Sequence, residues 1–212
     1  MSRRPLAIDV VADVMCPWCY IGARNLAAAL AELPEVDATV RHHPFLLDPS
    51  TPDGGVDLRE RLRAKYGGDP DAMFARVQDA ARNAGLSIDF ATVRRSYPTA
   101  AAHTLLRHAE AKGTQPALLE ALFDAYFLRG ADVGSPAVLA EVASAHGFER
   151  DEALRLASDP AELAKTRDEA RSMSQQGVTG VPFFIFGERL AAAGAQPPEA
   201  LRGAILKALD AG

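Results

Sequence analysis

The chain contains only two cysteines, and two residues separate them in the segment Cys16-Pro17-Trp18-Cys19. Residues 6–14, just before this segment, are apolar and rich in valine, which predicts a β-strand. After it, apolar side chains recur at helical spacing, at Cys19, Ala23, Leu26, Leu30 and Leu33. We therefore expect both thiols at a turn where a strand leads directly into a helix, a placement that suits reversible disulfide chemistry.

Within this turn, Cys16 occupies the predicted N-cap of the helix and Pro17 its first position, where the missing N–H has no cost. The unpaired N–H groups and the dipole at a helix N-terminus stabilise a thiolate, which makes Cys16 the attacking sulfur. Cys19 lies three residues further on, at the edge of the buried stripe, and is close enough to form a disulfide. The sequence predicts Cys16 as the catalytic nucleophile and Cys19 as the resolving thiol.

The same pair of cysteines is also half of a tetrahedral zinc site, which needs two more ligands. No third cysteine is present, so histidines would have to complete the site. His42 and His43 are adjacent on a predicted strand and point to opposite faces. His103 and His108 do not have the i, i+4 spacing that places two ligands on one helix face. The pattern favours redox chemistry and predicts no bound metal.

Composition excludes several other classes of function. A chain of 212 residues with 48% hydrophobic and 24% charged residues is typical of a compact globular protein. The net charge of -5 argues against general nucleic-acid binding, and no run of about twenty apolar residues predicts a membrane span. Asp9 and Asp13 interrupt the first apolar segment, so we expect no signal peptide and a cytoplasmic protein whose thiols rest reduced. A monomer and a homodimer fit the sequence equally.

The remaining chain divides into a helical block with strand character on either side. A second strand is predicted over residues 36–45, followed by a loop rich in Pro, Asp and Gly. Strand character returns at residues 181–186, before a turn at Gly187-Glu188, a strand over 189–193 and a final helix over 198–209. Between them we find no good strand and predict helices at 58–66, 70–84, 99–112, 115–129, 135–146, 151–157 and 160–176.

This order predicts an α/β protein with a thioredoxin fold, in which a large all-helical domain is inserted between the βαβ half and the C-terminal ββα half. We expect residues 1–56 and 177–212 to form the thioredoxin-like domain and residues 57–176 to form the inserted helical domain. Three helices of the insertion carry a start signal, since Asp69, Ser135 and Asp159 each precede a proline.

Motifs spread over nearly the whole chain carry a family resemblance. They are Cys16-Pro17-Trp18-Cys19-Tyr20-Ile21-Gly22, Lys65-Tyr66-Gly67, Ala102-His103, residues 122–127, residues 177–184 and Gly194-Ala195-Gln196-Pro197. Together they resemble DsbA-family thiol–disulfide oxidoreductases of the FrnE-like branch, whose members place a helical domain inside a thioredoxin core. Relatives on this scaffold include glutathione-dependent 2-hydroxychromene-2-carboxylate isomerases and kappa-class glutathione transferases.

The resemblance implies a role for Val181 and Pro182 that spacing does not supply. The pair matches the loop in which thioredoxin-like proteins hold a cis-proline facing the redox cysteines. A cis bond there would expose the backbone of Val181 for pairing with a substrate peptide or glutathione. Pro17, Trp18, Val181 and Pro182 are the predicted substrate-binding residues. Without the resemblance, the sequence favours an ordinary proline that opens a strand.

Two further polar residues, Asp13 and His103, each have more than one interpretation in the sequence. Asp13, three residues before Cys16, would accept a proton from Cys19 if it is buried, and it suits a solvated carboxylate at a strand end equally well. His103 matches a histidine in the family's Asn-Thr-x-x-Ala-His segment, although Pro98 stands at the Asn position here. We interpret His103 as a helix histidine whose hydrogen bonds are satisfied.

The predicted function is therefore thiol–disulfide exchange through a mixed disulfide, with a protein, peptide or small molecule that carries a disulfide or a thiol. It needs no metal or nucleotide cofactor, and glutathione is a candidate co-substrate. A strongly oxidising pair would work against a cytoplasmic glutathione pool, which favours a reductase or isomerase. One alternative is a glutathione-dependent isomerase or transferase. In isomerases of this type the nucleophile position resembles Ser rather than Cys, so both cysteines of this chain count against it. The other is a redox-switched peptide-binding module.

Overall fold

A mixed four-stranded sheet forms the centre of the structure, a computed structural model that describes residues 3–211. Its strand order is β2-β1-β5-β6, with β1 parallel to β2 and antiparallel to β5, and with β6 antiparallel to β5. The strands are β1 (Arg4–Ala12), β2 (Val36–Pro44), β5 (Phe183–Phe186) and β6 (Leu190–Ala193). Helix α1 (Pro17–Ala31) joins β1 to β2, and α9 (Pro198–Asp210) follows β6. This arrangement confirms the predicted order of a βαβ half and a ββα half.

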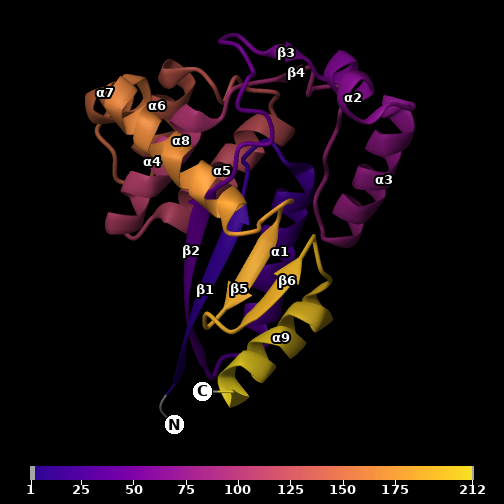
Figure 1. Ribbon diagram of the computed structural model, residues 1–212, viewed down its shortest axis with the longest axis vertical. Coiled ribbons are helices and arrows are strands. Elements are labelled where there is room, and N and C mark those ends of the chain that lie inside the picture. The colour runs from indigo at the N-terminus through magenta and orange to yellow at the C-terminus, as the bar shows by residue number, and fades with distance from the viewer. Residues whose placement is uncertain (1–2, 212) are drawn as a thin grey trace.

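The sheet and α9 lie in the lower part of Figure 1, where both ends of the chain are also found, and the helical block lies above them. Strand β1 runs through the middle of the sheet, where Ile8 and Val11 are fully buried. Burial alternates along the first part of β1, where Ala7 is exposed and Asp9 partly exposed, and only its last three residues, 10–12, are buried in succession and so covered on both faces. The chain leaves the carboxyl end of β1 and enters α1 through residues 13–16. That sheet end is where α/β folds commonly bind ligands.

Seven helices occupy the chain between β2 and β5 in the described residues. They are α2 (Leu58–Tyr66), α3 (Pro70–Asn83), α4 (Ala100–Ala111), α5 (Gln115–Phe127), α6 (Pro136–Ser144), α7 (Arg150–Ser158) and α8 (Pro160–Gln175). The prediction of no strand in this part of the chain is wrong, because two two-residue strands, β3 (Val56–Asp57) and β4 (Arg95–Ser96), pair here. They are too short to show any periodicity, and their pairing depends on contacts between distant segments.

Aspartates start three of these helices. The side chains of Asp57, Asp69 and Asp159 accept hydrogen bonds from backbone N–H groups in the first turns of α2, α3 and α8. Such caps satisfy N–H groups that have no partner within the helix. Ser135 is the N-cap residue of α6, as predicted, but its side chain makes no capping hydrogen bond.

An aromatic cluster joins α1 to the helical block. The Tyr20 ring stacks on Phe123 and Phe127 of α5, with ring centroids 5.0 and 5.7 Å away. The Tyr20 hydroxyl donates a hydrogen bond to Asp124 on the same helix. Because Tyr20 follows Cys19 directly, this cluster fixes the first turns of the helix that carries both thiols.

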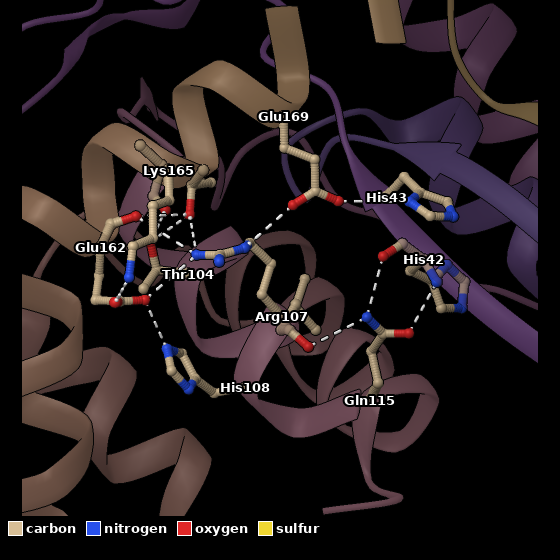
Figure 2. A network of polar contacts seen from close by, with 12 residues as sticks. His42, His43, Thr104, Arg107, His108, Gln115, Glu162, Lys165 and Glu169 are labelled. Atoms are coloured by element: carbon tan, nitrogen blue, oxygen red, sulfur yellow. Dashed lines mark hydrogen bonds and ion pairs between the residues drawn. The ribbon is translucent and has the colours of Figure 1, made fainter. Parts of the chain in front are cut away.

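A polar network holds α8 against α4 and β2 (Figure 2). The Arg107 guanidinium lies 3.1 Å from Glu169 and 3.5 Å from Glu162. Glu162 also pairs with His108 at 2.8 Å, and Glu169 lies 3.4 Å from His43. A network of several charges contributes more to stability than an isolated surface ion pair does. No helix in the described part of the chain is long and apolar enough to cross a membrane.

Candidate functional site

The two thiols lie at the start of α1. Cys16 is the N-cap residue and Pro17 takes the first helical position, which confirms the geometry predicted for this turn. The backbone N–H of Cys19 donates a 3.0 Å hydrogen bond to the Cys16 carbonyl oxygen, so the turn begins at the first thiol. Both cysteines are free, and they are 4% and 2% exposed. A partner sulfur must therefore approach through the local surface formed around Cys16.

The environments of the two thiols differ. Burial raises the pKa of the Cys19 thiol well above its usual value, and the neighbouring Cys16 side chain adds to this rise. A backbone hydrogen bond with Asp13 acts in the opposite direction. Cys16 instead borders the unpaired N–H groups at the N-terminus of α1, which favour an anion. This asymmetry suits one sulfur that attacks first and a second that needs a base.

The loop before β5 closes the other side of Cys16. The Val181–Pro182 peptide bond is cis, and the Cys16 thiol donates to the Val181 carbonyl oxygen across an Sγ–O distance of 3.8 Å. Pro182 also approaches α1 closely at Gly22, where an added Cβ would lie 2.9 Å from the Pro182 Cγ atom. The absence of a side chain at Gly22 therefore lets this loop pack against the helix that carries the thiols.

The predicted substrate-binding residues differ in how exposed they are. Pro17, Trp18 and Val181 are partly exposed, whereas Pro182 is buried. The guanidinium of Arg76, from α3, lies 5.8 Å from the centre of the Trp18 ring. Sequence reasoning missed Arg76 because nothing in the local pattern of α3 links it to the thiol motif. The helical block thus supplies a positive charge next to the only tryptophan.

Asp13 and His103 meet behind the thiols. Asp13 is fully buried, and its two carboxylate oxygens accept hydrogen bonds from the backbone N–H groups of Met15 and Leu47, at 3.4 and 2.8 Å. The Nε2 atom of His103 lies 3.6 Å from Asp13 Oδ1. The interpretation of His103 as a satisfied helix histidine is wrong, because its buried Nε2 has no hydrogen-bond partner among the described residues. The contact joins segments too distant in the sequence for spacing to reveal it.

No group of three or more His, Cys, Asp or Glu side chains in the described residues is arranged to hold a metal ion. His42 and His43 point apart from each other, as strand geometry requires. His43 contacts Asp9 and Glu169, whereas His42 is buried near α5.

Comparison with known proteins places this fold and site in a family. The model of the DSBA-like thioredoxin domain matches residues 7–206. A structure described as a "probable DsbA oxidoreductase" from Streptomyces coelicolor is 31% identical, with a TM-score of 0.87 over 97% of this chain and 90% of that one. The chain belongs to the DsbA-like thioredoxin family of thiol oxidoreductases. The search of curated proteins gave no match.

More distant structures share the fold. The cytosolic disulfide reductase DsbM from Pseudomonas aeruginosa, solved with GSH, is 21% identical with a TM-score of 0.70, and the match covers 96% of this chain and 99% of that one. A 2-hydroxychromene-2-carboxylate isomerase is 17% identical with a TM-score of 0.73, and 95% of each chain is covered. Together these matches confirm a thioredoxin-like DsbA fold with a helical insertion.

Proposed function

We propose that the protein is a thiol–disulfide oxidoreductase that reduces or isomerises disulfides through a mixed disulfide on Cys16. The observation that supports this most directly is the position of Cys16, at the N-cap of α1 and 3.8 Å from the Val181 carbonyl oxygen. The helix N-terminus favours the attacking thiolate. The backbone of Val181 offers main-chain pairing to an extended substrate beside the reacting sulfur.

The reaction proceeds in two exchanges. The Cys16 thiolate attacks one sulfur of the substrate disulfide, whose S–S bond breaks, and the other substrate sulfur leaves as a thiolate that takes up a proton. Cys19 then loses its proton, attacks Cys16 Sγ and releases the first substrate sulfur as a second thiolate. The substrate gains two electrons, and the two cysteines become a disulfide. A thiol reductant such as glutathione returns that disulfide to the dithiol.

The second exchange needs a base, because burial raises the pKa of Cys19. Asp13 is a fully buried carboxylate beside Cys19, and we assign it as the proton acceptor. His103, 3.6 Å from the Asp13 carboxylate, acts as a positioning residue that stabilises the charge on Asp13 before the proton arrives. We also propose that the protein is a member of the FrnE-like branch and is located in the cytoplasm.

The surroundings of Cys16 favour a peptide-like disulfide as substrate. Trp18 and Pro17 supply an apolar surface, and Val181 and Pro182 supply backbone groups that recognise an extended chain with little side-chain selectivity. Arg76 adds a positive charge that suits a substrate carboxylate. The structural neighbour DsbM was solved with GSH, a tripeptide thiol, which supports glutathione disulfide and peptide disulfides as the first compounds to test.

Trapping of the mixed disulfide tests the assigned roles. We expect Cys19→Ser to accumulate a covalent adduct when mixed with insulin or glutathione disulfide, and Cys16→Ser to form none under the same conditions. Intact-protein mass before and after reduction identifies the adduct. Normal insulin reduction by Cys19→Ser would show that Cys19 is not the resolving thiol. Adducts on Cys16→Ser and none on Cys19→Ser would reverse the two roles.

Equilibration in graded glutathione buffers separates the oxidoreductase from the alternatives. A single two-electron transition between dithiol and intramolecular disulfide is expected, and its midpoint decides between a reductant and an oxidant, since about 30 mV is a tenfold change in the equilibrium constant. A persistent glutathione adduct on Cys16 would instead favour a glutathione-dependent isomerase or transferase. No pairing of the thiols at any ratio would contradict the oxidoreductase and would leave only a peptide-binding module without a disulfide switch.

A further inference from the structure

A cavity that neither thiol lines lies between α1, β2 and α5. Its volume is about 330 Å³, which is within the range of small-molecule sites. Its walls are mostly apolar side chains that alternate along β2 and recur at helical spacing along the two helices. Among them are Val40, His42, Leu26, Leu30, Leu119 and Phe123. Neither cysteine, nor Val181 or Pro182, lines this cavity.

His42 is the unusual residue in this apolar wall. Gln115 fixes its backbone at both ends, accepting from the His42 N–H at 2.8 Å and donating to its carbonyl oxygen at 3.0 Å (Figure 2). The imidazole is 9% exposed, and its Nδ1 atom is buried with no hydrogen-bond partner among the described residues. Buried polar atoms normally have a partner, since leaving one unpaired costs free energy. Nδ1 itself has almost no accessible surface, so a ligand in the cavity would pair with the part of the imidazole that remains exposed.

The ring of His42 is suited to a neutral partner. Burial lowers the pKa of His42 to about 3, with smaller effects from His43 and His103, so the imidazole is uncharged at neutral pH. A neutral imidazole donates through one nitrogen and accepts through the other. A hydroxyl group complements it, because a hydroxyl also both donates and accepts.

The rest of the lining excludes an ionic ligand and favours an aromatic one. Arg24 and Glu120 are the charged residues of the lining, and they pair with each other at 3.2 Å, with about half of each side chain exposed. The Tyr20 hydroxyl is occupied by its bond to Asp124, so Tyr20 offers its ring. That ring and Phe123, whose centroids are 5.0 Å apart, form an aromatic part of the wall.

We propose that this cavity is a binding site for a small uncharged aromatic alcohol or phenol, whose ring lies among the side chains of α1 and α5 and whose hydroxyl pairs with His42. The site is separate from the thiol chemistry and does not depend on the proposed oxidoreductase function. Several residues of α1 line it, and among them Tyr20, the residue after Cys19, is the nearest in sequence to the thiols.

Titration of the full chain with 2-naphthol at neutral pH tests the proposal, with naphthalene as the analogue that lacks the hydroxyl. We expect saturable binding of 2-naphthol at one site, measured by its fluorescence or by calorimetry. Ala23→Leu, which fills the cavity from α1, should weaken this binding at least about tenfold. Ala28→Leu is the matched control, because Ala28 is exposed on the same helix and does not line the cavity, and its binding should be unchanged.

His42→Phe keeps an aromatic ring without its nitrogens, and it should weaken 2-naphthol about tenfold while leaving naphthalene unaffected. If this variant does not fold, the side-chain ¹H–¹⁵N spectrum of the wild-type histidines replaces it, with a shift of the His42 resonances on addition of 2-naphthol as the expected result. Cys16→Ser should bind 2-naphthol as the wild type does. Absence of saturable binding, binding that survives Ala23→Leu, or binding lost in Cys16→Ser would each overturn the proposal.

Discussion

His103 Nε2 lies 3.6 Å from Asp13 Oδ1, and the two side chains are 3% and 0% exposed. A buried carboxylate is costly unless polar groups surround it, and Asp13 has two backbone N–H groups in addition to this imidazole. Cys19 is buried beside the same aspartate. The three side chains therefore form a polar group behind the reactive thiol.

Asp13→Asn tests the role proposed for this carboxylate. We expect the attack of Cys19 on the mixed disulfide to slow by about 100-fold, because general base catalysis of this kind contributes about 10²–10⁴-fold. Accumulation of the Cys16 adduct, followed by mass after acid quenching, measures that step. Asp9→Asn is the control, since Asp9 lies on β1, four residues before Asp13, and pairs with His43 rather than with the thiols. Equal rates in the wild type and Asp13→Asn would remove Asp13 from the mechanism.

His103→Gln tests the positioning role by a measure that simple loss of packing would not change. We expect the resolving step to slow by about tenfold and its dependence on pH to change shape, because His103 no longer stabilises the charge on Asp13. The rate of the first attack by Cys16 should be unaffected. A fall in both rates by the same factor, with an unchanged pH profile, would indicate a structural role only.

Local patterns in the sequence were sufficient to predict much of the fold and the position of the thiols at the start of a helix. Pro17 marks the first position of α1 and therefore the N-cap at Cys16, and the aspartates before α3 and α8 mark where those helices begin. The spacing of apolar side chains in strands and helices depends only on residues close together in the chain, so it can be recognised in the sequence.

Contacts between distant segments could not be predicted in this way. The approach of His103 to Asp13 and of Arg76 to Trp18 depends on how α4 and α3 pack beside β1 and α1. The cavity near His42 is a similar case. Each of its walls follows an ordinary periodicity, but the space exists only because three elements meet without filling it.

Gly22→Ala tests the close packing between α1 and the loop at Pro182. An added Cβ would lie 2.9 Å from Pro182 Cγ and 3.1 Å from Phe184 Cζ, so these atoms must move. We expect the free energy of unfolding to fall by about 1–3 kcal/mol, measured by urea denaturation. Gly203→Ala is the matched control, because Gly203 lies in α9 and an added Cβ meets nothing within 4 Å. It should raise stability by about 0.5–1 kcal/mol, and equal effects at both sites would contradict the packing argument.

Tyr20→Phe tests the hydrogen bond that ties α1 to α5. The ring remains stacked on Phe123, but Asp124 loses the hydroxyl that donates to it. Because hydrogen bonds to charged groups contribute about 1.5–3 kcal/mol, we expect a loss of about 2 kcal/mol in the free energy of unfolding. Tyr97→Phe removes a hydroxyl from a partly buried tyrosine with a ring contact to Tyr126, and it should cost less. A loss for Tyr20→Phe that is no larger than the loss for Tyr97→Phe would show that the hydrogen bond to Asp124 does not stabilise the fold.

The contact of His43 with Glu169 and Asp9 makes stability depend on pH. The hydrogen bond to Glu169 raises the pKa of His43 above its usual value, and Asp9 adds to this rise although partial burial opposes it. A raised pKa in the folded state means that the stabilisation is complete below about pH 6.5, the unfolded value, and is lost as the pH rises through the folded value. Glutamine does not titrate, so the stability of His43→Gln lacks this dependence on pH.

We therefore expect the wild type to exceed His43→Gln in free energy of unfolding by about 1 kcal/mol near pH 6, with the difference shrinking toward pH 9. Urea denaturation of both proteins at half-unit steps measures it. His42 has the opposite sign, because its lowered pKa favours the folded state at higher pH, but it is present in both proteins and largely cancels in the difference. A difference that grows with pH would contradict the assignment of a stabilising charge to His43.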